Sequence, residues 1–258
     1  MVKIHPTAIV DSAAELADGV EIGAYAYVGG RVRLGSGTVV SHHATVDGNT
    51  QMGKNNQIFP YAFIGGKTHD LKYVGGDPGL KIGDNNVFRE YTTVHAATME
   101  EHYTLVGDNN NILAYSHIAH DCVVGNYIVM SSHAALAGHV VVGDHAVIAW
   151  SAGAHQFTRI GEYSMVSAMT KQVKDLPPFF ISDGNPAEVC TINKINMQRN
   201  GFTTEEIDIA YSAFKLIYKH RLSRPNAIAL LQQRPDASSR VISLLVKFMT
   251  AHSERGLA

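Results

Sequence analysis

The chain has 258 residues, of which 45% are hydrophobic and 17% are charged, and its formal net charge is −2 at pH 7. This balance gives no global reason to expect nucleic-acid binding, and no uncharged run of about 18 apolar residues predicts a membrane span. The two cysteines, Cys122 and Cys190, have no framework spacing, and no signal-peptide pattern opens the chain. We therefore expect a soluble cytoplasmic protein.

From Ile4 to Val166, nearly every sixth residue is apolar. Of the 28 positions in this series, 25 are apolar, and the exceptions are Asp70, Gly76 and Glu100. Six residues do not fit a helix, because six steps of 100° carry the series around the helix surface. The residue after each series position is often glycine, which we expect to supply conformational freedom for a tight corner. Each hexad therefore predicts one short strand and one corner, and hexads must stack to bury their apolar residues.

Two segments interrupt the series, residues 65–81 and residues 97–104. Both leave its phase unchanged, since each gap in the series is a whole number of hexads. We predict that both segments are external loops. Long loops on a rigid scaffold are common places for functional residues.

The series ends near Val166, and the proline-containing segment 174–190 ends the regular coil. Helical periodicity follows, and its first segment begins with the capping-box spacing of Thr203 and Glu206. Helices are predicted over 207–218, 225–233 and 237–252.

The hexads resemble those of the hexapeptide-repeat family of left-handed parallel β-helices. The resemblance implies a three-sided prism with three hexads per coil, and it also supplies the left hand, which the period alone does not give. The predicted fold class is therefore mainly β, a left-handed parallel β-helix followed by a small α-helical domain. We place the left-handed β-helix domain at residues 1–190 and the helical C-terminal cap at residues 191–258.

Seven of the 14 histidines lie between residues 102 and 155, and the densest motif is Ser-His-Ile-Ala-His-Asp-Cys at 116–122. A coil of three hexads places His120 beside Gly138 and Asp121 beside His139. This cluster offers a base, an acidic neighbour and a backbone N–H group. Several histidines outside the cluster are interpreted as solvated corner or surface residues: His5, His42, His43, His133, His145 and His220.

An ordered set of motifs makes a closer resemblance: HPTAIV, DLKY, HIAHDC, LAGHV, AHQF, PPFFISDGNPA and RNGF. In order and spacing they resemble the UDP-N-acetylglucosamine O-acyltransferase family of lipid A biosynthesis. The resemblance implies transfer of a 3-hydroxyacyl chain from acyl carrier protein to the 3-hydroxyl group of UDP-N-acetylglucosamine. It also implies a homotrimer with its active sites between subunits, and neither a cofactor nor a metal.

The resemblance assigns His120 as general base, Asp121 as the residue that orients it, and the Gly138 N–H group as oxyanion donor. It implies a larger set of substrate-binding residues: His69, Asp70, Lys72, His117, His139, His155, Gln156, Asn193 and Arg199. Lys72 and the cap residues are expected to hold phosphate and nucleotide. The acyl groove is expected at Ser167, Ala168 and Met169, where small residues favour a longer chain.

Three positions depart from the family pattern: His69 replaces a glutamine, and Ile195 and Asn200 stand where Glu and a second Arg are frequent. Losing that Arg weakens phosphate recognition unless another basic residue compensates. Some relatives acylate a 3-amino sugar, so an amide product stays open. The sequence is also compatible with a hexapeptide transferase that uses another acyl donor such as acetyl-CoA, with a γ-carbonic-anhydrase-like zinc enzyme using His117 and His120, and with a non-catalytic scaffold.

Overall fold

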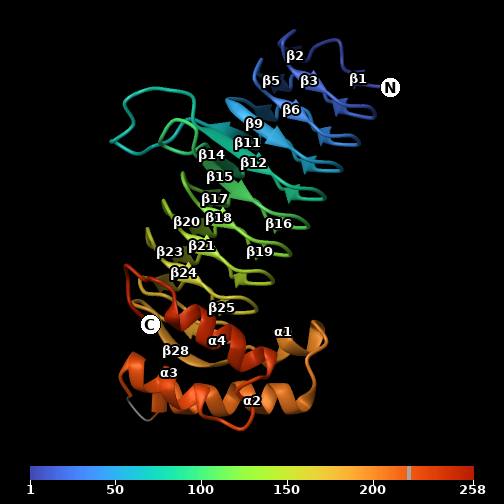
Figure 1. The fold of residues 1–258 in the computed structure, drawn as a ribbon. Coiled ribbons are helices and arrows are strands. Elements are labelled where there is room, and N and C mark those ends of the chain that lie inside the picture. Colours follow the sequence, from blue (N-terminus) through green and yellow to red (C-terminus); the bar gives the residue numbers. More distant parts are fainter. Residues whose placement is uncertain (220–221) are drawn as a thin grey trace.

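A computed structural model describes residues 1–219 and 222–258, so His220 lies outside the described residues. Three parallel sheets form the walls of a long prism, and helices gather at its C-terminal end (Figure 1). The mainly β class, with stacked short parallel strands and a small helical part, is thus confirmed.

Each wall of the prism is one sheet of short strands. The first sheet contains β1 (Lys3–Ile4), β4 (Glu21–Ile22), β7 (Val39–Val40), β10 (Gln57–Ile58), β13 (Val87–Phe88), β16 (Asn111–Ile112), β19 (Val129–Met130), β22 (Val147–Ile148), β25 (Met165–Val166), β27 (Phe180–Asp183) and β28 (Glu188–Ile192). The second sheet contains β2 (Ile9–Val10), β5 (Tyr27–Val28), β8 (Thr45–Val46), β11 (Phe63–Gly66), β14 (Thr93–His95), β17 (His117–Ile118), β20 (Ala135–Leu136), β23 (Gly153–Ala154) and β26 (Lys171–Gln172). The third sheet contains β3 (Glu15–Leu16), β6 (Arg33–Leu34), β9 (Asn49–Met52), β12 (Gly79–Ile82), β15 (Tyr103–Val106), β18 (Val123–Val124), β21 (Val141–Val142) and β24 (Arg159–Ile160). Only the pairing of β27 with β28 is antiparallel among the described strands.

The strand register repeats every three hexads, as between Ile4 and Ile22. It lengthens to five hexads from Ile58 to Phe88 and to four hexads from Ile82 to Val106. The insertions are thus two hexads and one hexad long, which is why the apolar series keeps its phase. Both external loops exist.

The loops are shorter than predicted. They cover 67–78 and 96–102, because β11, β12 and β15 extend into the predicted loop segments, whereas the second loop begins one residue earlier than predicted. β9, β12 and β15 pair in register over four residues each, which draws the loop ends into the third sheet.

The apolar series fills the prism interior. Its apolar members from Ile22 onward are buried, whereas Ile4 in the first coil is 49% exposed. The apolar series ends at Val166 as predicted, but the coil continues through β26, where the next sixth residue is the buried polar Gln172. Its amide is satisfied there: Nε2 donates to the Lys174 carbonyl oxygen at 2.7 Å, and Oε1 accepts from the Ser182 hydroxyl at 2.5 Å.

The glycines that follow the series residues allow close stacking of neighbouring coils. Apart from Gly65 (φ 84°), they do not adopt the left-handed conformation, so the prediction that they supply conformational freedom at the corner is wrong. A Cβ atom on Gly23 or Gly35 would come closer than 3.0 Å to the backbone of the next coil. The left-handed residue stands two positions further on and is usually Asn, Asp, His or an aromatic residue, as at Tyr25 (φ 58°) and His139 (φ 61°).

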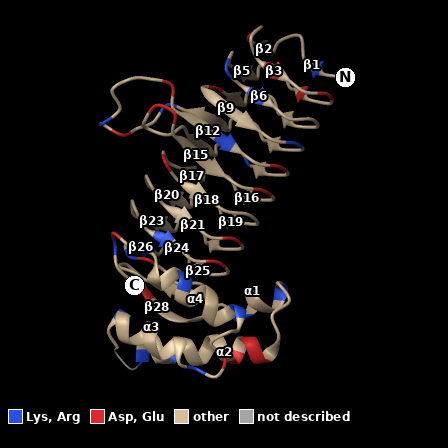
Figure 2. Ribbon diagram, viewed as in Figure 1, with Lys and Arg blue, Asp and Glu red and all other residues tan. Residues whose placement is uncertain are grey.

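The cap contains α1 (Lys194–Arg199), α2 (Thr204–Phe214), the π-helical turn η1 (Lys215–Lys219), α3 (Arg224–Gln232) and α4 (Arg240–Thr250). The capping box of Thr203 and Glu206 is confirmed, and the acidic first turn of α2 is the red segment in Figure 2. The three predicted helices are present, with boundaries shifted by a few residues. α1 was not predicted, and the domain boundary near residue 190 stays a prediction.

Candidate active site

Three corners connect the three walls, and we number them by the sheet that each follows. The first corner joins the first sheet to the second, the second corner joins the second to the third, and the third corner returns to the first. Both external loops leave the prism at the second corner. Successive coils there carry Asp121, His139 and Phe157 in left-handed conformation, one above the other. The rings of His139 and Phe157 stack, with centroids 4.6 Å apart.

His120 lies two residues beyond the end of β17 and is fixed through one nitrogen. Its Nδ1 atom lies 2.8 Å from Asp121 Oδ2 and 3.1 Å from Thr98 Oγ1. The side chains of His120 and Asp121 are only 13% and 9% exposed. A carboxylate only accepts hydrogen bonds, so Nδ1 carries the proton and Nε2 keeps a free lone pair. The imidazole is therefore arranged as a base.

Asp121 stays ionised in this position. Burial by itself raises the pKa of the carboxyl group, but hydrogen bonds from His120 and Thr98 outweigh burial and hold the pKa below its usual value. The Thr98 N–H group donates to Oδ1 at 3.2 Å, while the Asp121 N–H group donates to Thr104 Oγ1 at 2.8 Å. Asp121 is thus a fixed negative charge beside the imidazole.

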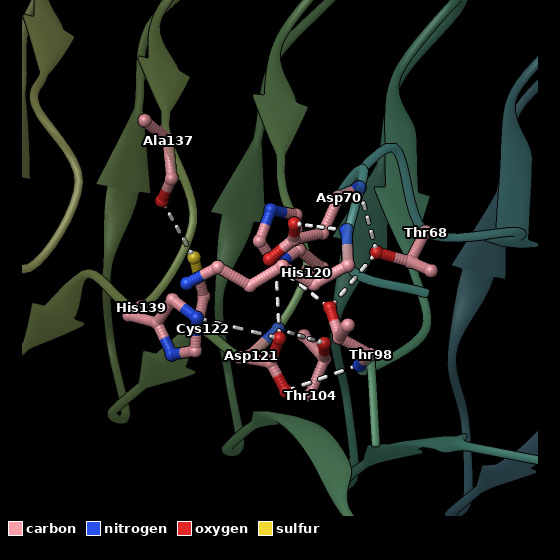
Figure 3. Close-up of polar contacts among 10 residues, drawn as sticks. Thr68, Asp70, Thr98, Thr104, His120, Asp121, Cys122, Ala137 and His139 are labelled. Carbon is pink, nitrogen blue, oxygen red and sulfur yellow. Dashed lines mark hydrogen bonds and ion pairs between the residues drawn. The ribbon is translucent and has the colours of Figure 1, made fainter. Parts of the chain in front are cut away.

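A line of hydroxyl groups connects the two external loops to His120 (Figure 3). Thr98 Oγ1 lies 3.0 Å from Thr68 Oγ1, and both threonines are buried. The Asp70 N–H group donates to Thr68 Oγ1 at 3.1 Å, and Asp70 Oδ1 accepts from the Lys72 N–H group at 2.9 Å. Because both loops converge on Thr98, they place Asp70 over the imidazole.

Gly138 lies against the face of His120. A Cβ atom at this position would come closer than 3.0 Å to the imidazole ring, so only glycine leaves room for it. Within the described residues, the Gly138 N–H group has no protein hydrogen-bond acceptor. The corresponding N–H group in the third corner, that of Asn126, donates to Asp144 Oδ1 at 2.8 Å. The second corner therefore leaves a backbone donor free next to the base.

His139 completes the cluster predicted from coil spacing. Its ring meets that of His120 edge to face at 5.4 Å, and its Nε2 atom lies 3.7 Å from Asp121 Oδ2. Asp70, His120 and His139 each offer one ligand atom within 4.8 Å of the others, and they are the metal-competent group found among the described residues. His117, which the zinc-enzyme interpretation required, does not belong to this group.

His69, His95 and His117 form a second group of rings beside the first. His95 contacts His69 at 4.0 Å and His117 at 4.8 Å between ring centroids. Burial, followed by the neighbouring histidines, lowers the pKa of His95 to about 4 and also lowers the pKa of His117. His117 Nδ1 is bound to Thr93 Oγ1 at 2.7 Å, whereas His95 Nδ1 is buried with no partner within the described chain.

The predicted residues His155 and Gln156 lie one coil further along the second corner than Gly138, and both are exposed. They are held by the C-terminal tail. Arg255 donates from Nε to the Gln156 carbonyl oxygen at 2.8 Å and contacts His155 Nδ1 at 2.7 Å.

The predicted cap residues lie away from the second corner. Asn193 is buried and works locally: its Oδ1 caps α1, and its Nδ2 donates to the Tyr163 carbonyl oxygen at 3.0 Å. Tyr163 belongs to the third corner. Arg199 and Ile195 are exposed on α1, and Asn200 Nδ2 donates to the Asn196 carbonyl oxygen at 2.9 Å.

The predicted acyl-groove residues Ser167, Ala168 and Met169 directly follow β25 and so lie at the first corner. Ala168 is exposed, and Met169 is 64% exposed and does not fold back into the prism. A single chain therefore brings together the second-corner residues only. The cap residues and the acyl-groove residues lie at the other two corners.

Thr98, Thr68 and His95 were missed from the sequence. Thr98 lies in a segment recognised only as a loop, and no spacing rule connects it to His120. His95 follows the series residue Val94 and could have been noticed as a histidine next to a buried strand position.

The fold and site define a parallel β-helix protein that has a helical cap and, at one corner, a histidine hydrogen-bonded to an aspartate. A family model described as UDP-N-acetylglucosamine O-acyltransferase, domain 2, matches residues 175–258. The acyl-[acyl-carrier-protein]–UDP-N-acetylglucosamine O-acyltransferase of Paraburkholderia phymatum is 44% identical over 261 residues, covering 100% of this chain and 99% of the relative.

Solved structures agree with the sequence comparison. The structure of LpxA from Acinetobacter baumannii has a TM-score of 0.95 at 38% identity and covers 99% of each chain. The UDP-N-acetylglucosamine O-acyltransferase of Moraxella catarrhalis has a TM-score of 0.94 at 38% identity, with 98% of each chain covered. The chain belongs to the UDP-N-acetylglucosamine O-acyltransferase family, and its prism is a left-handed β-helix. No helix among the described residues is long and apolar enough to span a membrane.

Proposed function

We propose that this protein transfers a 3-hydroxyacyl chain from acyl carrier protein to the 3-hydroxyl group of UDP-N-acetylglucosamine, in the cytoplasm, as the first step of lipid A biosynthesis. The observation that carries the proposal is the fixed state of His120. Asp121 and Thr98 hold its Nδ1 atom, which leaves Nε2 as a base beside the free N–H group of Gly138. Two free cysteines, Cys122 and Cys190, suit a reducing compartment.

The reaction uses these groups in sequence. Nε2 of His120 takes the proton of the sugar hydroxyl as its oxygen attacks the thioester carbonyl carbon. The new negative charge on the carbonyl oxygen accepts a hydrogen bond from the Gly138 N–H group, while Asp121 stabilises the imidazolium. The C–S bond then breaks, and the thiolate of the carrier takes the proton from His120. The products are the sugar ester and the free carrier thiol.

The remaining predicted residues receive substrate roles in this proposal. Asp70, His69 and His117 flank the base on the acceptor side, and Lys72, on the same exposed loop, supplies positive charge for phosphate. His139, His155 and Gln156 extend the site along the second corner. Asn193 and Arg199 contact the nucleotide, and Ser167, Ala168 and Met169 border the acyl tail.

The homotrimer implied by the family resemblance is part of this proposal, and the positions of these residues support it. One prism cannot present three separate corners to one substrate, but a neighbouring copy can bring its cap and its first corner to the second corner of the next. A ring of copies with such head-to-tail contacts closes into a cyclic oligomer. Light scattering should therefore give three times the 28.0 kDa chain mass. A fully active monomer would contradict the proposal.

A direct assay tests the reaction. The purified protein is incubated with one acyl donor, either a 3-hydroxyacyl carrier protein of defined chain length or acetyl-CoA. The acceptor is UDP-N-acetylglucosamine or its 3-amino analogue, and products are identified by mass spectrometry. We expect an ester on UDP-N-acetylglucosamine. Transfer only to the amino sugar, or only from acetyl-CoA, would overturn the stated acceptor or donor, and no transfer at all would overturn the function.

A further inference from the structure

The C-terminal tail after α4 turns back to the β-helix. Figure 1 shows the C-terminus beside the last coils. Asp175, one coil beyond Phe157 in the second corner, donates its N–H group to the Gly256 carbonyl oxygen at 2.8 Å and accepts from the Ala258 N–H group at 2.9 Å. The buried Asp175 carboxylate is itself held by Arg159. The tail thus docks on the same corner that carries Asp121 and His139.

Docking places the Arg255 guanidinium on two neighbouring residues of the proposed site. Nε donates to the Gln156 carbonyl oxygen at 2.8 Å, and a terminal nitrogen lies 2.7 Å from His155 Nδ1. A guanidinium group has five N–H donors and no acceptor. His155 Nδ1 also lies 3.3 Å from the Gln156 carbonyl oxygen, but that oxygen already accepts from Arg255 Nε, and the contact of Nδ1 with Arg255 is shorter. Because the guanidinium can only donate, Nδ1 accepts from it, and the ring proton of the neutral imidazole sits on Nε2.

Arg255 has no carboxylate partner in the part of the chain that the structure describes. Its charge is thus not cancelled by an acidic side chain at the site. The planar fork of the guanidinium fits two acceptors at once, which a lysine ammonium does not reproduce.

We propose that Arg255 is a positioning residue of the active site, which fixes His155 in the tautomer whose Nε2–H group donates to a substrate oxygen. The substrate contact in this inference rests on the proposed function. The tautomer of His155 does not, because it depends only on the contact with Arg255.

The tautomer is measured first, on the protein without substrate. Nitrogen-15 spectra of histidine-labelled protein distinguish the Nε2–H form from the Nδ1–H form. We expect a single Nε2–H form for His155 in the unmodified protein and a mixture in Arg255→Gln. A mixture in both proteins, or an unchanged signal in the variant, would overturn the proposal.

Kinetics then separate positioning from general damage. Arg255→Gln should raise KM for one of the two phosphate-bearing substrates, the UDP-sugar or the carrier with its phosphopantetheine arm, by about tenfold. Its kcat should stay within about threefold. Saturation with each substrate in turn identifies which one is affected. A fall in kcat with both KM values unchanged would contradict a positioning role.

A double-mutant cycle shows whether Arg255 acts through His155. In a His155→Ala background, Arg255→Gln should add less than about twofold, because the group that it orients is already absent. Fully additive effects would refute the coupling. Arg33→Gln is the matched control, since Arg33 is an exposed arginine of the first coils that pairs with Glu15. If even the unmodified protein transferred no acyl group, the proposed function would fail, while the spectra would still decide the role of Arg255.

Discussion

The first and second corners share a backbone but differ in chemistry. Both repeat a left-handed residue once per coil, with φ of 64° at His133 in the first corner and 59° at Asp121 in the second. In the first corner, exposed rings stack in a column, and Tyr115 and His133 lie 4.9 Å apart with nearly parallel planes. In the second corner, the equivalent column meets two inserted loops.

The difference supports the proposal that contacts from the side make a base of the corner histidine His120. His133 contacts other rings, Tyr115 and Trp150, and makes no ion pair with an acidic side chain within the described residues. His120 is held by Asp121 and by Thr98, which the second loop delivers. The coil therefore supplies the position of His120 and the carboxylate beside it, and the second inserted loop adds the Thr98 contact that helps to orient the imidazole.

The largest test of this comparison is the removal of each imidazole. His120→Ala should lower kcat by about 10²–10⁴-fold, because a general base is lost. The melting temperature should stay close to that of the unmodified protein, since His120 does not fill the prism interior. Steady-state rates with acyl carrier protein and UDP-N-acetylglucosamine measure the effect.

His133→Ala is the matched control, because it removes a histidine from an equivalent place in the other column. We expect a rate within about twofold of the unmodified protein. Comparable losses in the two variants would mean that lateral contacts do not distinguish the corners. The assignment of His120 would then have to be abandoned.

The prism and the His120 cluster could be predicted because both follow from periods. The six-residue series gives the buried side chains, and three hexads per coil bring Gly138 and His139 to His120. Thr98, Thr68 and Arg255 could not be predicted in the same way. Their positions depend on how loops 67–78 and 96–102 and the tail fold over the coil, and irregular segments carry no period to extend. Gln172 was not recognised as an inward-facing residue because the series was defined by apolar side chains and its side chain is a polar amide.

The first corner is also expected to contribute to function, by setting the preferred acyl-chain length. This role is proposed for a later coil, where Ala168 borders the acyl tail. Each buried methylene contributes about 0.8 kcal/mol, or roughly fourfold in preference, so four methylenes discriminate by more than about a hundredfold. Ala168→Met should fill that space and shift preference toward shorter 3-hydroxyacyl donors. Competition between carrier proteins of different chain length measures the shift.

Tyr61 provides the control for chain length. It is 46% exposed at the first corner but lies in a much earlier coil than Ala168, so Tyr61→Ala should leave the donor profile nearly unchanged. An unaltered profile in Ala168→Met would place the chain-length determinant elsewhere and remove the preference for long donors.

A smaller effect is expected when the loop contact alone is removed. Thr98→Val keeps the size of the side chain but deletes the hydroxyl group that lies 3.1 Å from His120 Nδ1 and 3.0 Å from Thr68 Oγ1. The Thr98 N–H bond to Asp121 survives. Loss of one buried hydrogen bond costs about 1–1.5 kcal/mol, so kcat should fall by about tenfold.

The matched control for this test is Thr92→Val. Thr92 Oγ1 donates to the Leu113 carbonyl oxygen at 3.2 Å, inside the prism and away from His120. It should change stability by a similar amount but leave kcat within about twofold. Equal kcat values for Thr98→Val and the unmodified enzyme would show that Asp121 is sufficient to orient the imidazole.

The smallest effect concerns His95, which lies behind the second corner and whose burial lowers its pKa to about 4. The folded pKa is below the ordinary value of 6.5, so the fold favours the neutral ring. Its contribution to stability is complete above pH 6.5 and is lost as pH falls from 6.5 toward 4. Between pH 7 and pH 4.5 this should lower the free energy of unfolding by about 1–2 kcal/mol, with solvent near the adjacent loop reducing the full pKa difference. Phenylalanine cannot take up a proton, so the urea-denaturation midpoint of His95→Phe should depend less on pH over this range. A pH dependence in His95→Phe as steep as in the unmodified protein would show that other buried groups, such as His117, control the acid limb.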